Sequence, residues 1–175
     1  MKCLIIIPAY NEAANIEKVI NNIVQNYPQY DYVIINDGSI DKTEEVCANA
    51  GYQVLNLPIN MGIGGAVQTG YRYAKKNNYD VAVQIDGDGQ HDVAFLEDML
   101  KLLESGEADV VIGSRFVQKE GFQSTQIRRV GIRFLSILAR ILTGVQIRDI
   151  TSGYRVVNRR FIEIYANDYP ADYPE

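Results

Sequence analysis

Short apolar runs alternate with amphipathic stretches along most of the chain. The runs have the length of buried strands, and the stretches between them repeat apolar residues at helical spacing. This pattern predicts strands at 4–7, 32–35, 53–57, 81–85 and 110–112, separated by helices at 11–25, 41–50, 64–76 and 93–103. Strands that are apolar throughout are typical of a mostly parallel sheet with helices on both faces. We therefore expect a single α/β domain.

Polar residues mark the expected ends of several elements. Pro8 should stop the first strand, and Asn11 should cap the helix that follows it. Ser39 and Asp41 should cap the second helix, and Gly51 is placed as its C-terminal stop.

Four polar clusters directly follow predicted strands, at 8–12, 36–39, 86–91 and 113–115. Ligands of parallel α/β sheets bind beyond the carboxyl ends of the strands. We expect the four clusters to converge on that edge of the sheet and to form one site.

The most informative cluster is Asp86-Gly87-Asp88-Gly89-Gln90-His91, which follows the strand at 81–85. Paired carboxylates at a buried strand end are costly unless a cation meets them. Oxygen ligands suit Mg²⁺ or Mn²⁺, and Mg²⁺ often holds substrate phosphates. Taken alone, Asp-x-Asp is also compatible with a solvated turn, because Asp and Gly dominate turns.

Two other binding motifs do not fit the residues present. The segment Gly62-Ile63-Gly64-Gly65-Ala66 lacks the third glycine of a dinucleotide fingerprint, where the chain has Val67, and it follows the third predicted strand instead of the first. A calcium loop starting at Asp86 needs glycine where the chain has His91, and a helix where the sequence predicts a strand. We expect the glycines at 62–65 to allow tight backbone packing.

Composition and charge argue against several classes of protein. The 175 residues carry a formal net charge of −5, which argues against a nucleic-acid binder. No apolar run reaches membrane-spanning length. Cys3 and Cys47 lack metal or redox spacing, so we expect a cytoplasmic protein with two buried free thiols.

Basic residues concentrate between Arg115 and Arg148, where seven basic residues accompany one acidic residue. Such a tract fits an anionic ligand, a membrane surface or a solvated helix face. Its polar, Gly-containing stretch at 117–126 predicts a loop, and 128–142 predicts an amphipathic helix. The apolar side of that helix fits either core packing or contact with an anionic membrane.

Six motifs occur in order: Pro8-Ala9-Tyr10-Asn11-Glu12, Asn36-Asp37-Gly38-Ser39, Asn60-Met61-Gly62-Ile63-Gly64-Gly65-Ala66, Asp86-Gly87-Asp88-Gly89-Gln90-His91, Gly113-Ser114-Arg115 and Asp149-Ile150-Thr151-Ser152-Gly153-Tyr154-Arg155. Together they resemble glycosyltransferase family 2, whose GT-A fold is a Rossmann-like nucleotide-sugar-binding fold. The similarity is greatest to dolichol-phosphate-mannose synthases and bacterial polyprenyl-phosphate glycosyltransferases. Each motif alone is weak, whereas six in order are specific. The resemblance implies one catalytic domain over 1–175, with a nucleotide-sugar and metal half at 1–115 and an acceptor half at 116–175.

The resemblance also implies the donor-side residues. A pocket for a UDP- or GDP-sugar would be lined by Pro8, Tyr10, Glu12, Asp37, Asp86, Gly87 and Asp88. Mg²⁺ or Mn²⁺, held by Asp86, Asp88 and Gln90, would stabilise the departing diphosphate. Asp37 does not distinguish uracil from guanine, because both bases present an N–H donor. His91, the only histidine, is assigned to local structure.

On the acceptor side, Asp149 is the expected general base of an inverting single displacement, with helix capping as its alternative. A polyprenyl or dolichyl phosphate is already ionised, so Asp149 would orient it more than deprotonate it. Arg115, Arg128 and Arg129 suit phosphate groups, which guanidinium forks bind with two parallel hydrogen bonds. We expect the loop at 117–126 to close over the donor, and 128–142 to contact the inner face of a membrane peripherally.

Rival functions differ in their motifs. A nucleotidyltransferase needs a Gly-rich basic loop after the first strand, and the segment 8–12 is not such a loop. Two alternatives stay open: a glycosyltransferase with a polysaccharide or other non-lipid acceptor, and a non-catalytic nucleotide-sugar-binding module. The ending Asp172-Tyr173-Pro174-Glu175 has no capping element, and members of this branch continue into further helices, so we expect a C-terminally truncated domain.

Overall fold

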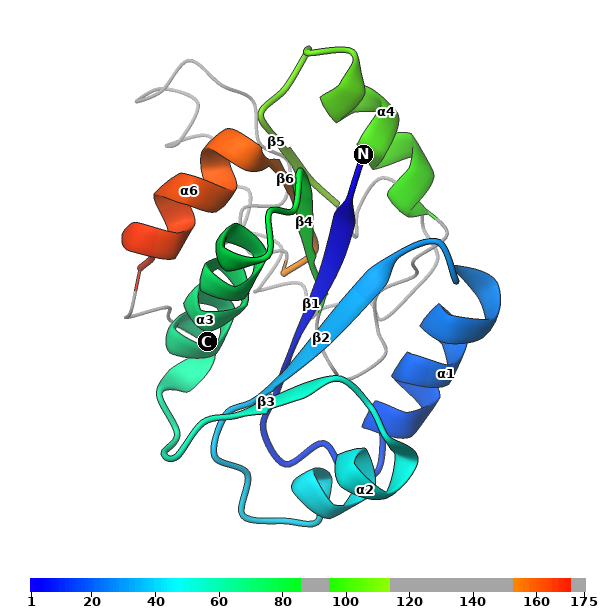
Figure 1. The fold of residues 1–175 in the computed structure, drawn as a ribbon, viewed down its shortest axis with the longest axis vertical. Coiled ribbons are helices and arrows are strands. Elements are labelled where there is room, and N and C mark those ends of the chain that lie inside the picture. The colour runs from blue at the N-terminus through cyan, green and yellow to red at the C-terminus, as the bar shows by residue number, and fades with distance from the viewer. Residues whose placement is uncertain (86–94, 114–152, 171–175) are drawn as a thin grey trace, which may run out of the picture.

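A computed structural model describes residues 1–85, 95–113 and 153–170, in which strands and helices alternate along the chain (Figure 1). The strands are β1 (Cys3–Ala9), β2 (Asp31–Asn36), β3 (Val54–Asn56), β4 (Val81–Gln84), β5 (Val110–Ile112) and β6 (Arg155–Asn158). The helices are α1 (Ile16–Asn26), α2 (Thr43–Ala50), α3 (Gly62–Lys76), α4 (Leu96–Glu104) and α6 (Arg159–Asn167).

The six strands form one sheet in the order β3-β2-β1-β4-β6-β5. β1 pairs in parallel with both β2 and β4, and β2 pairs in parallel with β3. β6 runs antiparallel to its neighbours β4 and β5. The prediction of a mostly parallel sheet is therefore confirmed. β6 is the strand that runs in the opposite direction.

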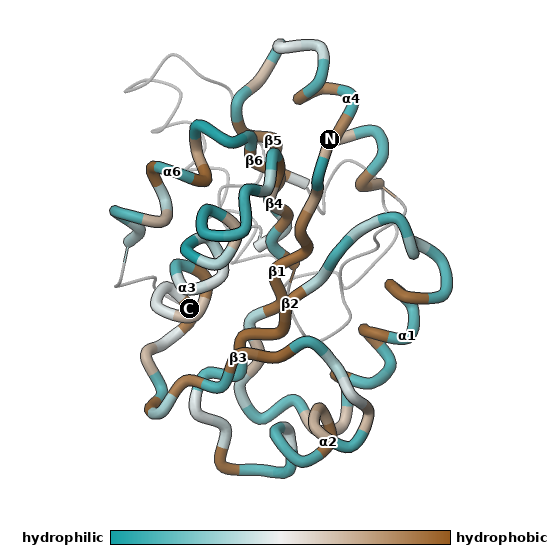
Figure 2. The backbone as a smooth tube through the Cα atoms, viewed as in Figure 1, coloured by the Kyte–Doolittle hydropathy of each residue, from teal (hydrophilic) through white to brown (hydrophobic). Residues whose placement is uncertain are grey.

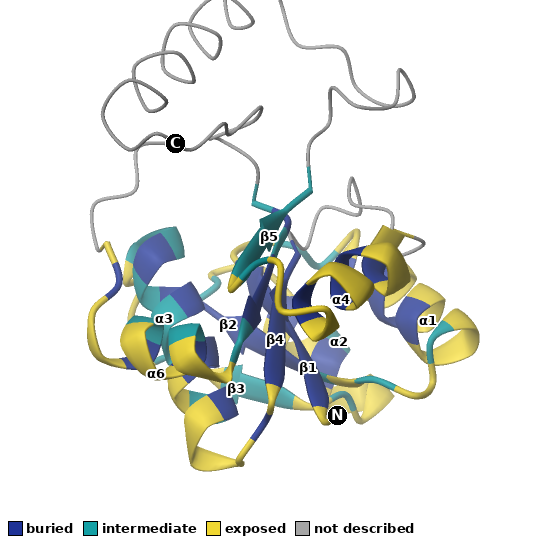
Figure 3. Cartoon of the chain, turned by 90° about the horizontal axis from the view of Figure 1, so that it is seen from above, coloured by how far each residue is buried: buried dark blue, intermediate teal, exposed yellow. Residues whose placement is uncertain are grey.

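Two apolar layers sandwich the sheet, one on each face. Because successive side chains of a strand point to opposite faces, Ile5 and Ile7 of β1 pack towards α1, α2 and α4, whereas Leu4 and Ile6 pack towards α3 and α6. Figure 2 shows the hydrophobic strands at the centre, and Figure 3 shows them buried between helices whose outer sides are exposed. Helices cover both faces of the sheet, as the sequence predicts.

A glycine sets the distance between α3 and the sheet. A Cβ on Gly70 would lie 2.2 Å from Cγ2 of Ile6, so no other residue fits there without displacing β1 or α3. This close packing fixes α3 over β1 and holds the N-terminal turn of α3 at the carboxyl edge of the sheet.

Three predicted ends differ from the structure. β1 continues through Pro8 to Ala9, because β1 pairs with β4 only as far as Ile6 and Pro8 needs no N–H towards that strand. Asn11 does not cap α1, which begins at Ile16; it has a φ of 57° and belongs to the loop before the helix. Ser39 does not cap α2, because its hydroxyl accepts a hydrogen bond from the N–H of Asn11.

The cap predicted at Asp41 is off by one residue, because Lys42 is the N-cap of α2; Asp41 Oδ1 accepts a hydrogen bond of 2.9 Å from the N–H of Thr43, the first residue of that helix. Other local predictions are confirmed. Gly51 ends that helix in the left-handed conformation, with a φ of 69°. Cys3 and Cys47 are buried free thiols. Within 1–85, 95–113 and 153–170, no helix is both long and apolar enough to span a bilayer.

Candidate functional site

The strand order creates a topological switch point at the carboxyl edge of the sheet. The chain moves from β1 to β2 and β3 on one side, and then crosses over through α3 to β4 on the other side of β1. Ligands of open α/β sheets bind at such a switch point, outside the carboxyl ends of the strands. The switch point here lies between the carboxyl ends of β1 and β4.

Pro8 and Ile85 lie at the ends of the two strands that flank this switch point. Pro8 is the penultimate residue of β1, and Ile85 follows β4 directly, with its N–H donating to the carbonyl of Ile6 at 3.1 Å. Ile85 is buried and is followed at once by Asp86. The sheet therefore delivers the start of the predicted metal motif to the switch point.

The loop from β1 to α1 is locked to the loop from β2 to α2. Asn11 Oδ1 accepts hydrogen bonds from the N–H groups of Ile40 and Asp41, at 3.0 and 3.3 Å. The N–H of Glu12 donates to Thr43 Oγ1 at 2.9 Å. The side chain of Tyr10, in the same loop, is 44% exposed. Tyr10 is therefore an accessible side chain on a loop that these hydrogen bonds hold in place.

Glu12 also organises the start of α1. Its carbonyl accepts hydrogen bonds from the N–H groups of Asn15 and Ile16, at 3.0 and 2.9 Å. Its Oε2 accepts one of 2.8 Å from Asn15 Nδ2. Glu12 therefore holds the entry to the helix, a role that is compatible with the predicted position in the donor pocket.

Asp37 joins a third loop to the framework. The side chain is only 3% exposed, and its Oδ1 accepts a hydrogen bond of 2.7 Å from the N–H of Met61, in the loop from β3 to α3. Gly38, with a φ of 64°, approaches the same loop so closely that a Cβ would lie 2.7 Å from Asn60 N. The predicted donor residue Asp37 thus has a structural role that the sequence did not indicate.

Three asparagines hold the loops of the site together, a role that the sequence analysis did not assign to them. Asn36 is buried, donates to Asn56 Oδ1 at 2.9 Å and accepts from the N–H of Ser39 at 3.2 Å. Asn11 bridges two loops as described above, and Asn60 Oδ1 accepts a hydrogen bond of 2.9 Å from the N–H of Gly62 at the start of α3. The sequence feature that could have identified them is a polar amide side chain at the end of an apolar strand or in a turn, where backbone groups need hydrogen-bond partners.

The structure brings two distant motifs into contact. The N–H of Gly113 donates to the carbonyl of Tyr154 at 2.9 Å, and a Cβ on Gly113 would lie 2.6 Å from Cδ1 of the Tyr154 ring. The pairing of β5 with β6 therefore joins the two ends of the segment that contains Arg115 and Asp149.

Buried tyrosines support the end of β4. The hydroxyl of Tyr169 donates to Oε1 of the buried Gln84 at 3.3 Å, two residues before Asp86. The ring of Tyr71 lies against Tyr165 and Tyr169, with ring centres 5.2 and 5.7 Å apart. Burial raises the pKa of the Tyr71 hydroxyl well above its usual range, so this side chain stays uncharged.

Several predicted residues and segments lie outside the described residues. They are the metal and donor residues Asp86, Gly87, Asp88 and Gln90, the acceptor residues Arg115, Arg128 and Arg129, the base Asp149, the loop 117–126 and the helix 128–142. Among the residues that are described, no group of three acidic, histidine or cysteine side chains could hold a metal ion.

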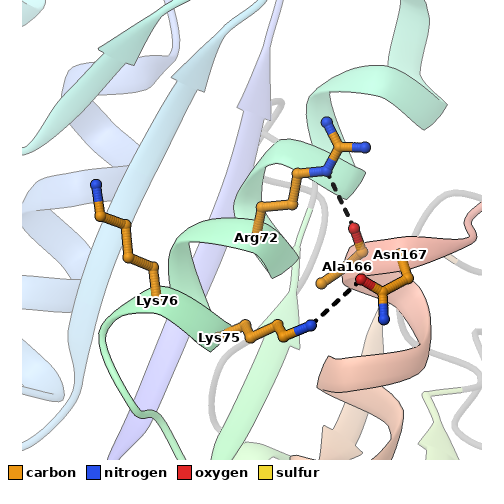
Figure 4. A pocket seen from close by; sticks show the side chains of 5 residues that line it. All are labelled: Arg72, Lys75, Lys76, Ala166 and Asn167. Atoms are coloured by element: carbon orange, nitrogen blue, oxygen red, sulfur yellow. Dashed lines mark hydrogen bonds between the residues drawn. The ribbon is translucent and has the colours of Figure 1, made fainter.

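A cavity of about 410 Å³ lies between α3 and α6, lined by Arg72, Lys75, Lys76, Ala166 and Asn167 (Figure 4). Arg72 Nε donates to the carbonyl of Ala166 at 3.0 Å, and Lys75 Nζ donates to Asn167 Oδ1 at 3.2 Å. Cationic side chains at the C-terminal end of a helix can donate hydrogen bonds to its last carbonyl groups and interact favourably with the helix dipole. These side chains of α3 therefore hold the C-terminal end of α6.

The sequence pattern of glycosyl transferase family 2 matches residues 4–165. The chain belongs to this family. The polyprenol monophosphomannose synthase of Mycolicibacterium smegmatis is 31% identical, over 93% of this chain and 63% of that protein. The undecaprenyl-phosphate mannosyltransferase of Micrococcus luteus is 32% identical, over 89% of this chain and 65% of that protein. The chain thus spans slightly less than two thirds of these relatives' length.

Solved structures show the same fold. The glucosyl-3-phosphoglycerate synthase of Mycobacterium tuberculosis, crystallised with Mn²⁺ and UDP-glucose, superposes with a TM-score of 0.69. The sequence identity is 23%, and the match covers 91% of this chain and 56% of that one. The family 2 resemblance and the GT-A fold predicted from the motifs are confirmed.

Proposed function

We propose that the chain is the catalytic domain of a metal-dependent, inverting glycosyltransferase. It moves a sugar from a UDP- or GDP-sugar to a lipid-linked phosphate, polyprenyl or dolichyl phosphate. The observation that carries this proposal is the framework of interlocked loops after β1 and β2, which holds Tyr10 and Asp37 at the edge of the sheet where β4 ends two residues before Asp86. Family relatives that are named for transfer to polyprenyl or undecaprenyl phosphate support the acceptor.

The donor binds against the loops after β1 and β2. Pro8, Tyr10, Glu12 and Asp37 surround the nucleotide, and a carboxylate oxygen of Asp37 accepts the N–H of the base. Because Oδ1 of Asp37 already accepts from Met61, the carboxylate is held at a fixed angle to receive that hydrogen bond.

Asp86, Gly87 and Asp88 would bind the diphosphate end of the donor. Asp86, Asp88 and Gln90 would supply an all-oxygen ligand set, which is the chemistry that Mg²⁺ and Mn²⁺ prefer. When bound, the ion neutralises the charge that develops on the departing diphosphate. The M. tuberculosis structure with Mn²⁺ and UDP-glucose is consistent with this assignment at the level of the fold.

The acceptor half, 116–175, completes the reaction. Arg115, Arg128 and Arg129 bind the acceptor phosphate through charge-assisted hydrogen bonds. Asp149 orients an oxygen of that phosphate for attack on the anomeric carbon, from the face opposite the diphosphate. A bond forms between that oxygen and the anomeric carbon as the bond to the nucleoside diphosphate breaks, which inverts the configuration. The loop 117–126 closes over the donor, and the enzyme works at the inner face of a membrane.

A transfer assay with Asp149→Asn tests the proposal. The wild-type chain, given Mn²⁺ and a panel of UDP- and GDP-sugars, should transfer sugar to a polyprenyl phosphate. The variant should lose about 10²-fold or more of the rate while donor affinity stays the same. The matched control Asp98→Asn, an exposed carboxylate on α4, should transfer normally.

Each part of the proposal has its own contradicting result. A normal rate for Asp149→Asn removes this residue from catalysis. Transfer to an oligosaccharide, with none to any polyprenyl phosphate, assigns a non-lipid acceptor. Donor binding without transfer to either acceptor identifies a nucleotide-sugar-binding module.

A further inference from the structure

Four buried polar side chains among the described residues lie near the carboxyl edge of the sheet: Asn36, Asp37, Thr43 and Gln84. The first three hold the loops of the donor site together through hydrogen bonds. Burial of a polar group costs free energy unless a hydrogen bond offsets that cost, so each such residue calls for an explanation. Gln84 is the member of this set that the loop framework does not explain.

Gln84 is the last residue of β4, and its partner comes from the far end of the chain. Side chains of a strand alternate between the two faces, so Gln84 shares with Ala82 the face that α3 and α6 cover (Figure 3). On that face the hydroxyl of Tyr169 donates to Oε1 of Gln84 at 3.3 Å, across 85 positions of the sequence. Both side chains are buried, so this hydrogen bond is shielded from water.

The antiparallel strand β6 explains how Tyr169 reaches this position. Asn158, the last residue of β6, pairs with Val81 at the amino end of β4. α6 starts directly after Asn158 and runs back against α3, and Tyr169 follows its last residue by two positions. The chain thereby returns to the carboxyl end of β4, where a residue of the acceptor half meets the strand that leads to the metal motif.

Ring packing holds Tyr169 in place independently of its hydroxyl. Its ring centre lies 5.2 Å from that of Tyr165, edge to face, and 5.7 Å from that of Tyr71. Such aromatic pairs are stabilising in their own right. A phenylalanine at this position would keep these contacts and lose the hydrogen bond to Gln84. The hydroxyl and the ring can therefore be tested separately.

Gln84 connects this contact to the metal motif. Its backbone is paired with β1 on one side and with β6 on the other. The N–H of Ile85 donates to the carbonyl of Ile6 at 3.1 Å, and Asp86 comes next in the chain. Rotation of the strand end would break the hydrogen bond to Tyr169 and leave a buried amide unsatisfied, which is costly. The hydrogen bond therefore holds the last strand residue in one orientation.

We propose that Tyr169 is a positioning residue of the donor site. Through Gln84 it fixes the direction in which the chain leaves β4 towards Asp86. This inference rests on the proposed function, which assigns Asp86 to the diphosphate and its metal ion. Tyr169 acts on donor affinity through Gln84, without contact with the donor.

Donor binding by Tyr169→Phe tests this role. The wild-type chain is titrated with a panel of UDP- and GDP-sugars in the presence of Mn²⁺, and the nucleotide-sugar that binds is kept for the variants. Its Kd should rise about threefold to tenfold in Tyr169→Phe, the range expected for the loss of one hydrogen bond. The KM of the donor should rise by the same factor, whereas the KM of the lipid phosphate acceptor should not change.

Tyr79→Phe is the matched control. Tyr79 is also a buried tyrosine, and its hydroxyl donates to Asp31 Oδ2 at 2.9 Å, at the amino edge of the sheet. Both variants should lower the melting temperature, because each leaves an acceptor without its donor. Only Tyr169→Phe should weaken donor binding. An equal change of the donor Kd in the two variants would assign the effect to lower stability and overturn the proposal.

A double variant separates positioning from stability, and it also provides the test if Tyr169→Phe does not fold. Gln84→Met combined with Tyr169→Phe removes both polar partners, so the melting temperature should recover towards that of the wild type while the donor Kd stays raised. Recovery of the donor Kd together with the melting temperature would overturn the positioning role.

Donor binding by the wild type separates this inference from the proposed function. If the wild-type chain binds no nucleotide-sugar with Mn²⁺, the proposed function fails. If the wild type binds one and Tyr169→Phe binds it equally well, the proposed function stands and the positioning role of Tyr169 is wrong.

Discussion

At the scale of single residues, the site depends on short polar side chains that bind backbone groups. Asn11 and Asp37 each accept N–H groups from a neighbouring loop, and so three separate loops act as one unit. Buried or strained backbone groups need such partners. The sequence indicates the polar residues at these positions, but the partners come from loops 24 to 29 residues away, which no local pattern reveals.

Asp41 should make stability depend on pH. Burial raises the pKa of its carboxyl, but hydrogen bonds from Thr43 and Ala13 lower it more, so the folded pKa lies below the ordinary value of about 3.9. A lowered folded pKa stabilises the protein above that ordinary value, and the contribution is lost as pH falls through the folded pKa. Melting curves should therefore show Asp41→Asn less stable than wild type at neutral pH, with the difference shrinking below about pH 3 to 4. An equal difference at every pH would contradict this account.

The two cysteines should be inert in the folded protein. Burial raises the pKa of Cys3 to about 12, with a contribution from Asp31, and burial also raises the pKa of Cys47. Thiolate is the reactive form, so a disulfide reagent at pH 8 should label neither residue until the protein unfolds. Labelling in denaturant should then give two thiols. Rapid labelling under native conditions would show that one of them is accessible.

At the scale of elements, the strands and helices of residues 1–85 and 95–113 were predicted from the sequence, whereas β6 and α6 were not. The apolar strands and Gly51 carry local signals that the structure confirms. β6 has only four residues, and its antiparallel pairing with β4 joins positions more than 70 residues apart, so periodicity gave no sign of it. α6 does have a helical signal, since Ile162 and Ala166 form its buried side four residues apart, and a search for that spacing would have found it.

The contact between β5 and β6 predicts the effect of Gly113→Ala. The added methyl group would meet the Tyr154 ring at 2.6 Å, so the substitution should lower the free energy of unfolding by about 1–3 kcal/mol. Denaturant unfolding measures the loss. In the background of Tyr154→Leu, which removes the ring, the same substitution should cost clearly less. Equal costs in both backgrounds would mean that the ring is not the obstacle.

At the scale of the whole molecule, strand order decides where chemistry takes place. The sequence predicted polar clusters after the strands, and the sheet order places the clusters at 8–12 and 36–39 at one edge, beside the switch point between β1 and β4. The fold therefore accounts for Pro8, Tyr10, Glu12 and Asp37 as a group. It also accounts for the contact of Gly113 with Tyr154 at the two ends of the acceptor-side segment.

Donor binding that requires a divalent metal is the measurement that tests this account most directly. A thermal-shift panel should identify one UDP- or GDP-sugar that raises the melting temperature in the presence of Mn²⁺. At a hundred times Kd the gain is about 2.7 kcal/mol, which corresponds to several degrees for a chain of this size. Removal of Mn²⁺ with a chelator, or Asp88→Asn, should abolish the shift, whereas Asp98→Asn should keep it. An unchanged melting temperature with every donor, with Mn²⁺ or Mg²⁺, would contradict the assignment of this edge of the sheet to a nucleotide-sugar.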